Sequence, residues 1–254
     1  MKCKVLLVGE GPSDIGDLAD QPSYREGRDG FLQPLLRKMV GEDVDLEFDG
    51  CKLMHLPKKP LGKSNAGRLQ AKNASRALAM ASAGGMNALV LAFDTDKSPG
   101  DPAKRIERKR RLHLLRASAE RGFAHEREHD EAAETIQTVI AVPCRMIEAW
   151  ALGDRKALAD LLDLPAESLD YDEPEELWGD EDDESSGHPK RVWRRVTEKR
   201  IDFAEIGAKA APSTLAKTCP DSFPPFADDV DRALRRCAAG SASSTSSRKP
   251  KRKR

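Results

Sequence analysis

Ala88-Leu-Val-Leu-Ala-Phe-Asp-Thr-Asp96 is the stretch that decides the fold, an apolar run that ends at a pair of aspartates. A strand without polar alternation is expected in a parallel sheet that helices cover on both faces. Residues i and i+2 of an extended segment point to the same side, so the carboxylates of Asp94 and Asp96 can face one point beyond the strand. Open α/β sheets bind ligands at this carboxyl edge, and Mg²⁺ binds through one or two carboxylates. The stretch therefore predicts an acidic divalent-metal site on a parallel sheet.

Glu10 occupies the corresponding place after another apolar run, Val5-Leu-Leu-Val8, in the tight turn Gly9-Glu-Gly-Pro-Ser-Asp14. The glycines on either side of it let the backbone turn sharply and approach a ligand closely. If this strand lies beside the strand at 88–93, Glu10 shares the site with the aspartate pair. Three carboxylates at one edge repel one another, so a cation is needed to hold them together. The alternative is that Glu10 and Asp14 only cap the helix that follows.

Glu148 follows a third apolar strand, predicted over 138–143. It either completes the acidic cluster, serves a second metal, or is a helix-start residue beside a packed Trp150. Asp154 is expected to be the N-cap of a helix over 154–162. Apolar spacing and stop signals further predict a strand at 46–54 and helices at 30–39, 64–83, 102–121 and 125–135, the last two continuous if the helix crosses Gly122. Strands that alternate with helices indicate an α/β fold with a mainly parallel sheet flanked by helices.

The composition suits a soluble protein with ion pairs on its helix surfaces, since 34% of the 254 residues are charged and 39% are hydrophobic. No stretch approaches the roughly 18 continuous apolar residues of a membrane-spanning helix, and the start of the chain does not resemble a secretion signal. We therefore expect a cytoplasmic protein with no membrane partner. The five cysteines are scattered without a Cys-x-x-Cys pair, which indicates neither a disulfide framework nor a thiolate zinc site.

Charge and composition divide the chain into four expected regions. Residues 1–163 form the α/β core, 164–188 an acidic exposed insert, and 189–239 a helical C-terminal extension packed on the core. Residues 240–254 are serine-rich and then basic, have no apolar side chains to bury, and are expected to be a disordered tail. Such a tail either binds nucleic acid with weak, salt-sensitive affinity or only improves solubility.

Several motifs resemble known families. Val8-Gly-Glu-Gly-Pro-Ser-Asp14 and Leu91-Ala-Phe-Asp-Thr-Asp96 resemble the Toprim domain of topoisomerases, primases and the overcoming-lysogenization-defect nucleases. Three later motifs resemble an uncharacterised bacterial Toprim-like family often associated with phage defence: Cys144-Arg-Met-Ile-Glu-Ala-Trp-Ala-Leu-Gly-Asp154, Gly187-His-Pro-Lys190 and Cys219-Pro-Asp-Ser-Phe223. The similarity touches most of residues 5–235. One departure is that the Toprim turn usually begins Val-Glu-Gly, whereas Gly9 precedes Glu10 here.

The resemblance implies a Rossmann-related, Toprim-like core that cleaves nucleic acid with Mg²⁺ or Mn²⁺ as cofactor, in prokaryotic anti-phage defence. Glu10 would be the general acid or base, and Asp94 and Asp96 the metal ligands, because a carboxylate-held metal neutralises phosphate charge and stabilises the leaving oxygen. A partner ATPase or another defence-system subunit is left open. Basic side chains must hold the phosphate backbone, and the candidates are Lys97, Arg105, the run Arg108-Lys-Arg-Arg111, and Lys190.

Two other functions remain as alternatives. His125-Glu-Arg-Glu-His129 matches the His-Glu-x-x-His signature of zinc proteases, in which His125 and His129 bind zinc and Glu126 is the base, with Glu148 about where a third ligand falls. The highly charged surroundings and the strand before Glu148 disfavour it, because zinc helices of this type are largely buried. The second alternative is a Toprim-like subunit that binds nucleic acid or a partner protein without cutting, since a catalytic site is proved by geometry and activity.

Overall fold

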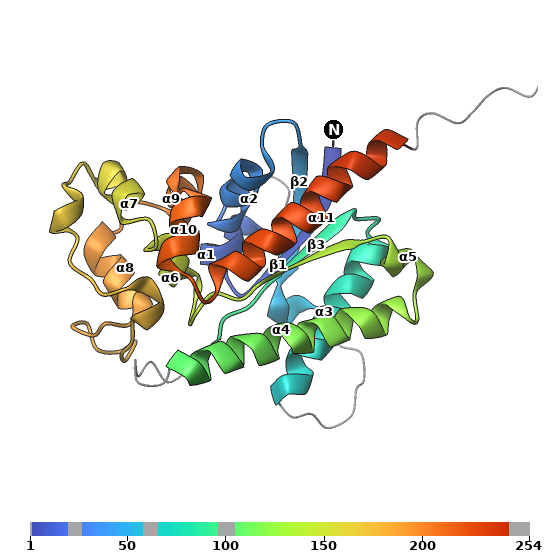
Figure 1. The fold of residues 1–254 in the computed structure, drawn as a ribbon, viewed down its shortest axis with the longest axis horizontal. Helices are drawn as coiled ribbons and strands as arrows, with labels where there is room; N and C mark the ends of the chain where they lie inside the picture. Colours follow the sequence, from blue (N-terminus) through green and yellow to red (C-terminus); the bar gives the residue numbers. More distant parts are fainter. Residues whose placement is uncertain (1, 20–26, 58–65, 96–104, 244–254) are drawn as a thin grey trace, which may run out of the picture.

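The sheet is four-stranded and entirely parallel, in the order β2-β1-β3-β4 (Figure 1). The computed structural model describes residues 2–19, 27–57, 66–95 and 105–243. The strands are β1 (Lys2–Gly9), β2 (Asp45–Lys52), β3 (Ala88–Ala92) and β4 (Gln137–Ala141). Every residue of β3 is buried, as expected for a strand with helices on both faces. The predicted fold class, a mainly parallel sheet flanked by helices with a helical C-terminal region, is confirmed.

Successive residues of a strand point to opposite faces of the sheet, so the apolar strands present apolar side chains on both faces, and helices cover each face. On one face, Val5 and Leu7 pack with α2 (Leu32–Val40) and α11 (Phe223–Ser243). On the other face, Leu6 and Val8 pack with α3 (Ala66–Ala83) and α4 (Arg105–Arg127). Short elements complete this half of the chain: α1 (Pro12–Ile15), η1 (Gly16–Ala19), η2 (Leu53–His55) and α5 (Glu131–Glu134).

Further helices gather beyond the carboxyl edge of the sheet (Figure 1). These are α6 (Ile147–Ala151), α7 (Arg155–Leu162), α8 (Pro189–Thr197), α9 (Phe203–Lys209) and α10 (Pro212–Thr218), with short turns η4 (Ala166–Ser168) and η5 (Pro174–Glu176). Asp154 caps α7 as predicted, since its side chain accepts from the Ala157 N–H. Lys38 of α2 donates to the carbonyls of Ala208, Lys209 and Ala210 at the end of α9, where a cation complements the helix dipole.

The edge of β4 that faces away from β3 is covered by α11 and α4. Asp229 of α11 accepts from the Ile140 N–H at 3.2 Å, and Arg116 of α4 donates to the Ile140 carbonyl at 2.9 Å. Arg116 and Asp229 also pair with each other at 2.7 Å. Side chains therefore satisfy both backbone groups of Ile140, which this edge strand would otherwise offer to another chain.

The helix predicted at 102–121 continues across Gly122, one of the two expectations, and ends at Arg127 as α4; the remainder of the segment predicted at 125–135 contains the separate short helix α5. Gly122 lies directly against α3: a Cβ there would be 2.1 Å from the Ala71 carbonyl oxygen. Helix α11 begins at Phe223 and includes Pro224 and Pro225. Its two prolines fall in the first helical turn, where no backbone donor is required.

The acidic insert at 164–188 is anchored rather than wholly exposed. Leu169 and Leu177 are buried in the core, and buried Glu175 accepts from the backbone N–H groups of Asp221 and Ser222. The C-terminal helices pack on the core as expected, and α11 extends to Ser243, past the predicted end at 239. Residues 244–254, most of the expected tail, lie outside the described residues. Within the described part of the chain, none of the helices has the length and apolar character needed to cross a bilayer.

Candidate functional site

The predicted acidic residues lie at the point where the strand order reverses. From β1 the chain moves outward to β2 on one side, and then crosses to β3 and β4 on the other. In open α/β sheets ligands bind outside the carboxyl ends of the strands at such a switch point. Glu10 directly follows β1 and Asp94 closely follows β3, and β1 and β3 are hydrogen-bonded neighbours. Both residues therefore lie at the place where this fold class binds ligands.

Glu10 and Asp94 are joined directly. The Oε1 atom of exposed Glu10 accepts a hydrogen bond from the backbone N–H of Asp94 at 2.8 Å. The carboxylate thus lies against the turn after β3, as the sequence predicted. Asp96 and Lys97 lie outside the described residues, so the second half of the aspartate pair has no structural account here.

Asp14, rather than Glu10, caps the turn after β1. Its Oδ2 atom accepts from the N–H groups of Glu10 at 2.7 Å and of Gly11 at 3.2 Å. The capping alternative is therefore right for Asp14, whereas Glu10 uses its side chain to reach another strand end. Burial raises the pKa of Asp14 to about 7; the two hydrogen bonds oppose this rise, and the charges of Glu148 and Glu10 add to it.

Glu148 lies in the first turn of α6 and faces the turn after β1. Ser13 donates its hydroxyl to Glu148 Oε1 at 3.4 Å, and the side chain is only 5% exposed. Burial raises the pKa of Glu148, while its own backbone hydrogen bond and the charge of Lys190 act in the opposite direction. Glu148 begins a helix that contains the fully buried Trp150, as one of the predicted alternatives has it, and its charge acts on Asp14 in the turn after β1.

A third hydrogen bond connects the turns after β3 and β4. Buried Thr95 accepts from the backbone N–H of Arg145 at 2.6 Å. Arg145 has a φ of 65°, a left-handed conformation that is uncommon for arginine and is often held in place at functional sites. Together with the Glu10–Asp94 and Ser13–Glu148 contacts, this bond closes a ring that links the ends of β1, β3 and β4. Sequence reasoning missed Ser13, Thr95 and Arg145, because nothing local indicates their partners.

Lys190, in the first turn of α8, lies at the same site. Partial burial alone would lower the pKa of its ammonium group, but the carboxylates of Glu148, Glu181 and Asp94 outweigh this and raise it. Its Nζ atom is 3.3 Å from Glu181 Oε1. The predicted phosphate-binding lysine therefore has two of the site's carboxylates as electrostatic neighbours.

The other basic candidates are placed less favourably. Arg105 is the first residue of α4, and its side chain lies outside the described part of the structure. Arg108 is buried at 2% exposure and is 3.9 Å from Glu176, and Lys109 pairs with Asp221 at 3.0 Å. Arg108 is thus part of the packing between α4 and the acidic insert rather than an exposed phosphate contact.

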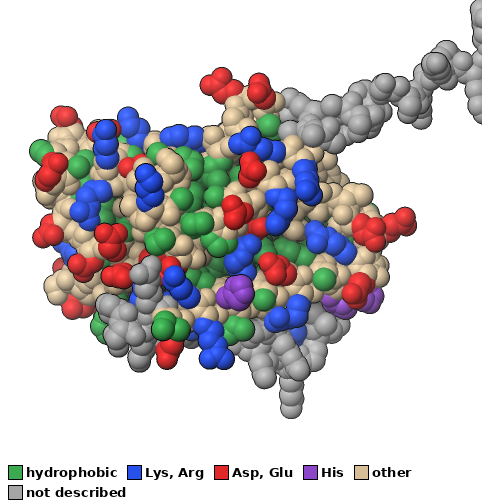
Figure 2. Space-filling model, in the orientation of Figure 1, with side chains coloured by type: hydrophobic (Ala, Val, Ile, Leu, Met, Phe, Trp, Pro, Cys, Tyr) green, Lys and Arg blue, Asp and Glu red, His purple; other side chains and the backbone are tan. Residues whose placement is uncertain are grey.

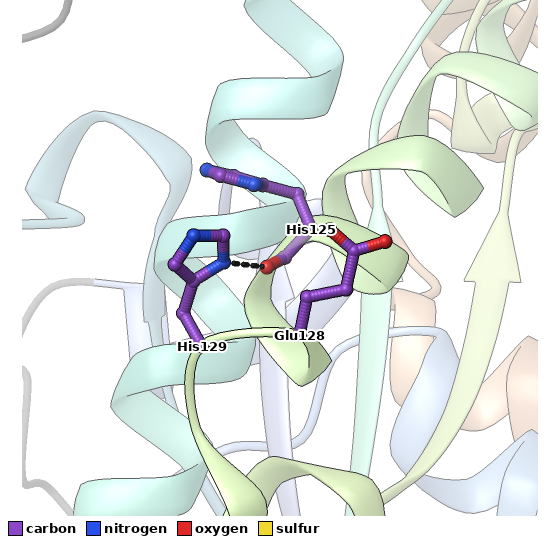
Figure 3. Close-up of side chains that lie close together, drawn as sticks. All are labelled: His125, Glu128 and His129. Carbon is purple, nitrogen blue, oxygen red and sulfur yellow. Dashed lines mark hydrogen bonds between the residues drawn. The ribbon is translucent and has the colours of Figure 1, made fainter.

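The His-Glu-x-x-His pattern gives a different arrangement from that of a zinc protease. His125, Glu128 and His129 have ligand atoms within 4.8 Å of one another at the end of α4 (Figure 3). Glu126, the expected base, is buried and accepts from Ser75 at 2.5 Å. This end of α4 leads back to the start of β4, so it lies at the opposite edge of the sheet from Glu148. Glu148 is therefore not the third ligand.

The carboxylates of Glu10, Asp94 and Glu148 are the candidate ligands for a hard cation at this edge, with Asp14 positioning the turn. All the donors are oxygens, which favour Mg²⁺ or Mn²⁺ over softer metals. These oxygens do not converge as ligands do in a closed site: among the described residues, the group whose ligand atoms all lie within 4.8 Å of one another is His125, Glu128 and His129. Burial and the charges of neighbouring carboxylates raise the pKa of Asp14, and burial raises the pKa of Glu148. Negative charge at this edge is therefore unfavourable, and a bound cation would offset it. Comparison of the chain with family models, curated proteins and solved structures finds no match.

Proposed function

We propose that this chain is a divalent-metal-dependent phosphodiesterase that cleaves nucleic acid, with Mg²⁺ or Mn²⁺ as its cofactor. The observation that carries the proposal is the hydrogen bond between Glu10 and the Asp94 backbone at the switch point of the sheet. Membership of a Toprim-like family, a cytoplasmic location, a role in anti-phage defence and a partner ATPase are parts of the same proposal. They rest on the resemblance of the motifs around Glu10, Asp94 and Glu148.

The roles of the residues follow from their surroundings. A bound divalent metal neutralises the nonbridging phosphate oxygens and stabilises the leaving oxygen. Glu10 is exposed, so water reaches its carboxylate, and it transfers the proton. Lys190 supplies a cation beside the carboxylates for the scissile phosphate. Glu148 lies beside the turn after β1, where its carboxylate would contribute to holding the metal.

The test is cleavage of plasmid, single-stranded DNA and RNA with Mg²⁺, Mn²⁺, Zn²⁺ or EDTA. We expect Mg²⁺- or Mn²⁺-dependent cleavage that Glu10→Gln and Asp94→Asn each abolish. The control is His125→Ala/His129→Ala, which removes the imidazoles at the opposite edge of the sheet and should leave cleavage unchanged. No cleavage with any metal would overturn the nuclease assignment and favour the non-catalytic binding subunit. Loss of activity only in the histidine variant would instead indicate chemistry at the end of α4.

A further inference from the structure

Helix α8 presents a cluster of cations to solvent. Arg191, Arg194, Arg195 and Lys199 line an open hollow of about 710 Å³, together with Glu184. The opposite side of the helix is fixed to the core, since Val192 and Trp193 are buried and Trp193 stacks on Phe203 at 4.6 Å between ring centroids. On the face of the molecule in Figure 2, basic and acidic side chains are interspersed.

One end of this basic helix is at the acidic site. Lys190, in its first turn, interacts with Glu148 and Asp94, and the remaining cations extend away from that point. Arg195 lies about 7.5 Å further along the helix at the rise of about 1.5 Å per residue, and Lys199 follows just after the helix ends at Thr197. The cations therefore form a track that leads to Lys190.

In the free protein the acidic segment 180–184 lies across this track. Arg191 donates to the backbone carbonyl of Glu181, whose carboxylate also pairs with Lys190 at 3.3 Å. Arg195 donates to the carbonyl of Glu184 at 3.5 Å. These contacts between α8 and the segment 180–184 are long or exposed, and exposed ion pairs contribute little stability. A polyanion of higher charge density can therefore take the place of the segment on the cations. Arg194 makes no ion pair within the described ranges.

An exposed aromatic side chain lies next to the start of α8. Trp178 is 56% exposed, although large apolar side chains are usually covered. Its backbone is in contact with the turn before α8, because a Cβ on Gly187 would lie 2.7 Å from the Trp178 carbonyl oxygen. A basic groove combined with an exposed aromatic ring is the combination by which proteins bind single strands, with the cations on the phosphates and the ring stacked on a base.

We propose that α8 and Trp178 form a docking surface for single-stranded nucleic acid that leads the strand to the Glu10–Asp94 site. The acidic segment 180–184 occupies this surface until the strand displaces it. The choice of ligand rests on the proposed function. The unpaired bases of a single strand, unlike those of a duplex, are available to the indole of Trp178.

The test is the affinity of a fluorescently labelled single-stranded oligothymidylate, measured by anisotropy in EDTA at several salt concentrations. Arg191→Gln/Arg194→Gln/Arg195→Gln should weaken binding roughly tenfold or more and lower the salt slope by about 2. Trp178→Ala should weaken it roughly five- to 100-fold. Glu181→Gln/Glu184→Gln should strengthen it. The matched control is Arg235→Gln/Arg236→Gln, two exposed arginines of α11.

Several outcomes would overturn the docking surface: no binding by the wild type, equal losses in the α11 control, unchanged affinity in the triple α8 variant, or duplex binding as tight as single-strand binding. Circular dichroism of each variant separates these results from misfolding. The assay contains no metal, so it is independent of cleavage. Binding without cleavage would reject the proposed nuclease and leave the surface standing. Cleavage that the α8 substitutions do not affect would reject the surface and leave the nuclease standing.

Discussion

The carboxylate of Glu10 accepts the backbone N–H of Asp94, with 2.8 Å between Oε1 and N, across the reversal point of the sheet. The glutamate after one strand is thereby held against the turn after its neighbour. The local geometry of the site is fixed mainly by backbone donors, while the charge comes from the side chains. Substitutions that keep shape but remove charge should therefore separate metal binding from folding.

Removal of charge at Glu10 or Asp94 should abolish stabilisation by metal without unfolding the protein. We expect millimolar Mg²⁺ or Mn²⁺ to raise the melting temperature of the wild type, since a ligand at 100 times its dissociation constant stabilises by about 2.7 kcal/mol. Glu10→Gln and Asp94→Asn should melt near the wild-type temperature in EDTA and gain nothing from metal. Differential scanning calorimetry checks this. An undiminished metal-induced shift in both variants would show that the ion binds elsewhere.

Asp229 should be among the most sensitive positions for stability. Its carboxylate is 4% exposed, pairs with Arg116 and accepts from the edge strand β4. Asp229→Ala leaves a partly buried guanidinium and a buried N–H without this acceptor, which should cost about 3–5 kcal/mol in the free energy of unfolding. Asp231→Ala, an exposed acid two residues away, should change it by less than about 0.5 kcal/mol. Urea denaturation of both variants gives the comparison, and similar losses would contradict it.

Gly122→Ala should destabilise the protein although alanine favours helices. The added Cβ would lie 2.1 Å from the Ala71 carbonyl oxygen, so α3 and α4 would have to separate. Such overpacking costs about 1–3 kcal/mol or more, which exceeds the gain of about 1 kcal/mol in helix propensity. The control is Glu120→Ala on the exposed side of α4, expected within about 0.5 kcal/mol of wild type. A Gly122→Ala protein as stable as wild type would show that the two helices can move apart freely.

Glu175 should make stability depend on pH. Burial raises its pKa above the ordinary value of 4.5, against the opposing hydrogen bonds from Ser222 and Asp221. Its contribution to stability is therefore complete below about pH 4.5 and declines as pH rises through the raised pKa, by at most about 1.4 kcal/mol per pH unit. Glu175→Gln cannot ionise, so its stability relative to wild type should improve as pH rises from 4.5. Urea midpoints across pH test this, with exposed Glu173→Gln as control, and parallel profiles for Glu175→Gln and wild type would refute it.

The strands and the meeting of Glu10 with Asp94 were predictable because both depend on regular features. Continuous apolar runs indicate a covered parallel sheet, and the ends of neighbouring parallel strands meet at one edge. The bonds Ser13–Glu148 and Thr95–Arg145 were not predictable, because each joins residues whose proximity is set by the packing of distant segments. Nothing in their local sequence distinguishes these hydroxyls from ordinary turn residues.

Two further features depend on direction and context that a sequence pattern leaves out. The His-Glu-x-x-His pattern does not show which side of α4 faces the core, and Glu126 turns inward to Ser75. The acidic composition of 164–188 predicts an exposed insert, and much of the segment is exposed, but its composition does not indicate that Leu169 and Leu177 are buried and anchor it. The burial of a few apolar side chains can anchor a segment that contains many charged ones, because the charged side chains remain in water at little cost in free energy.

Helix α11 completes the cover over one face of the sheet. Phe226, Val230 and Leu234 of α11 cover the same face of the sheet as Val5 and Leu7, which are synthesised more than two hundred residues earlier. Covering of this face therefore requires residues 223–243, and a chain in which they are not yet in place exposes apolar side chains that can bind chaperones or other chains.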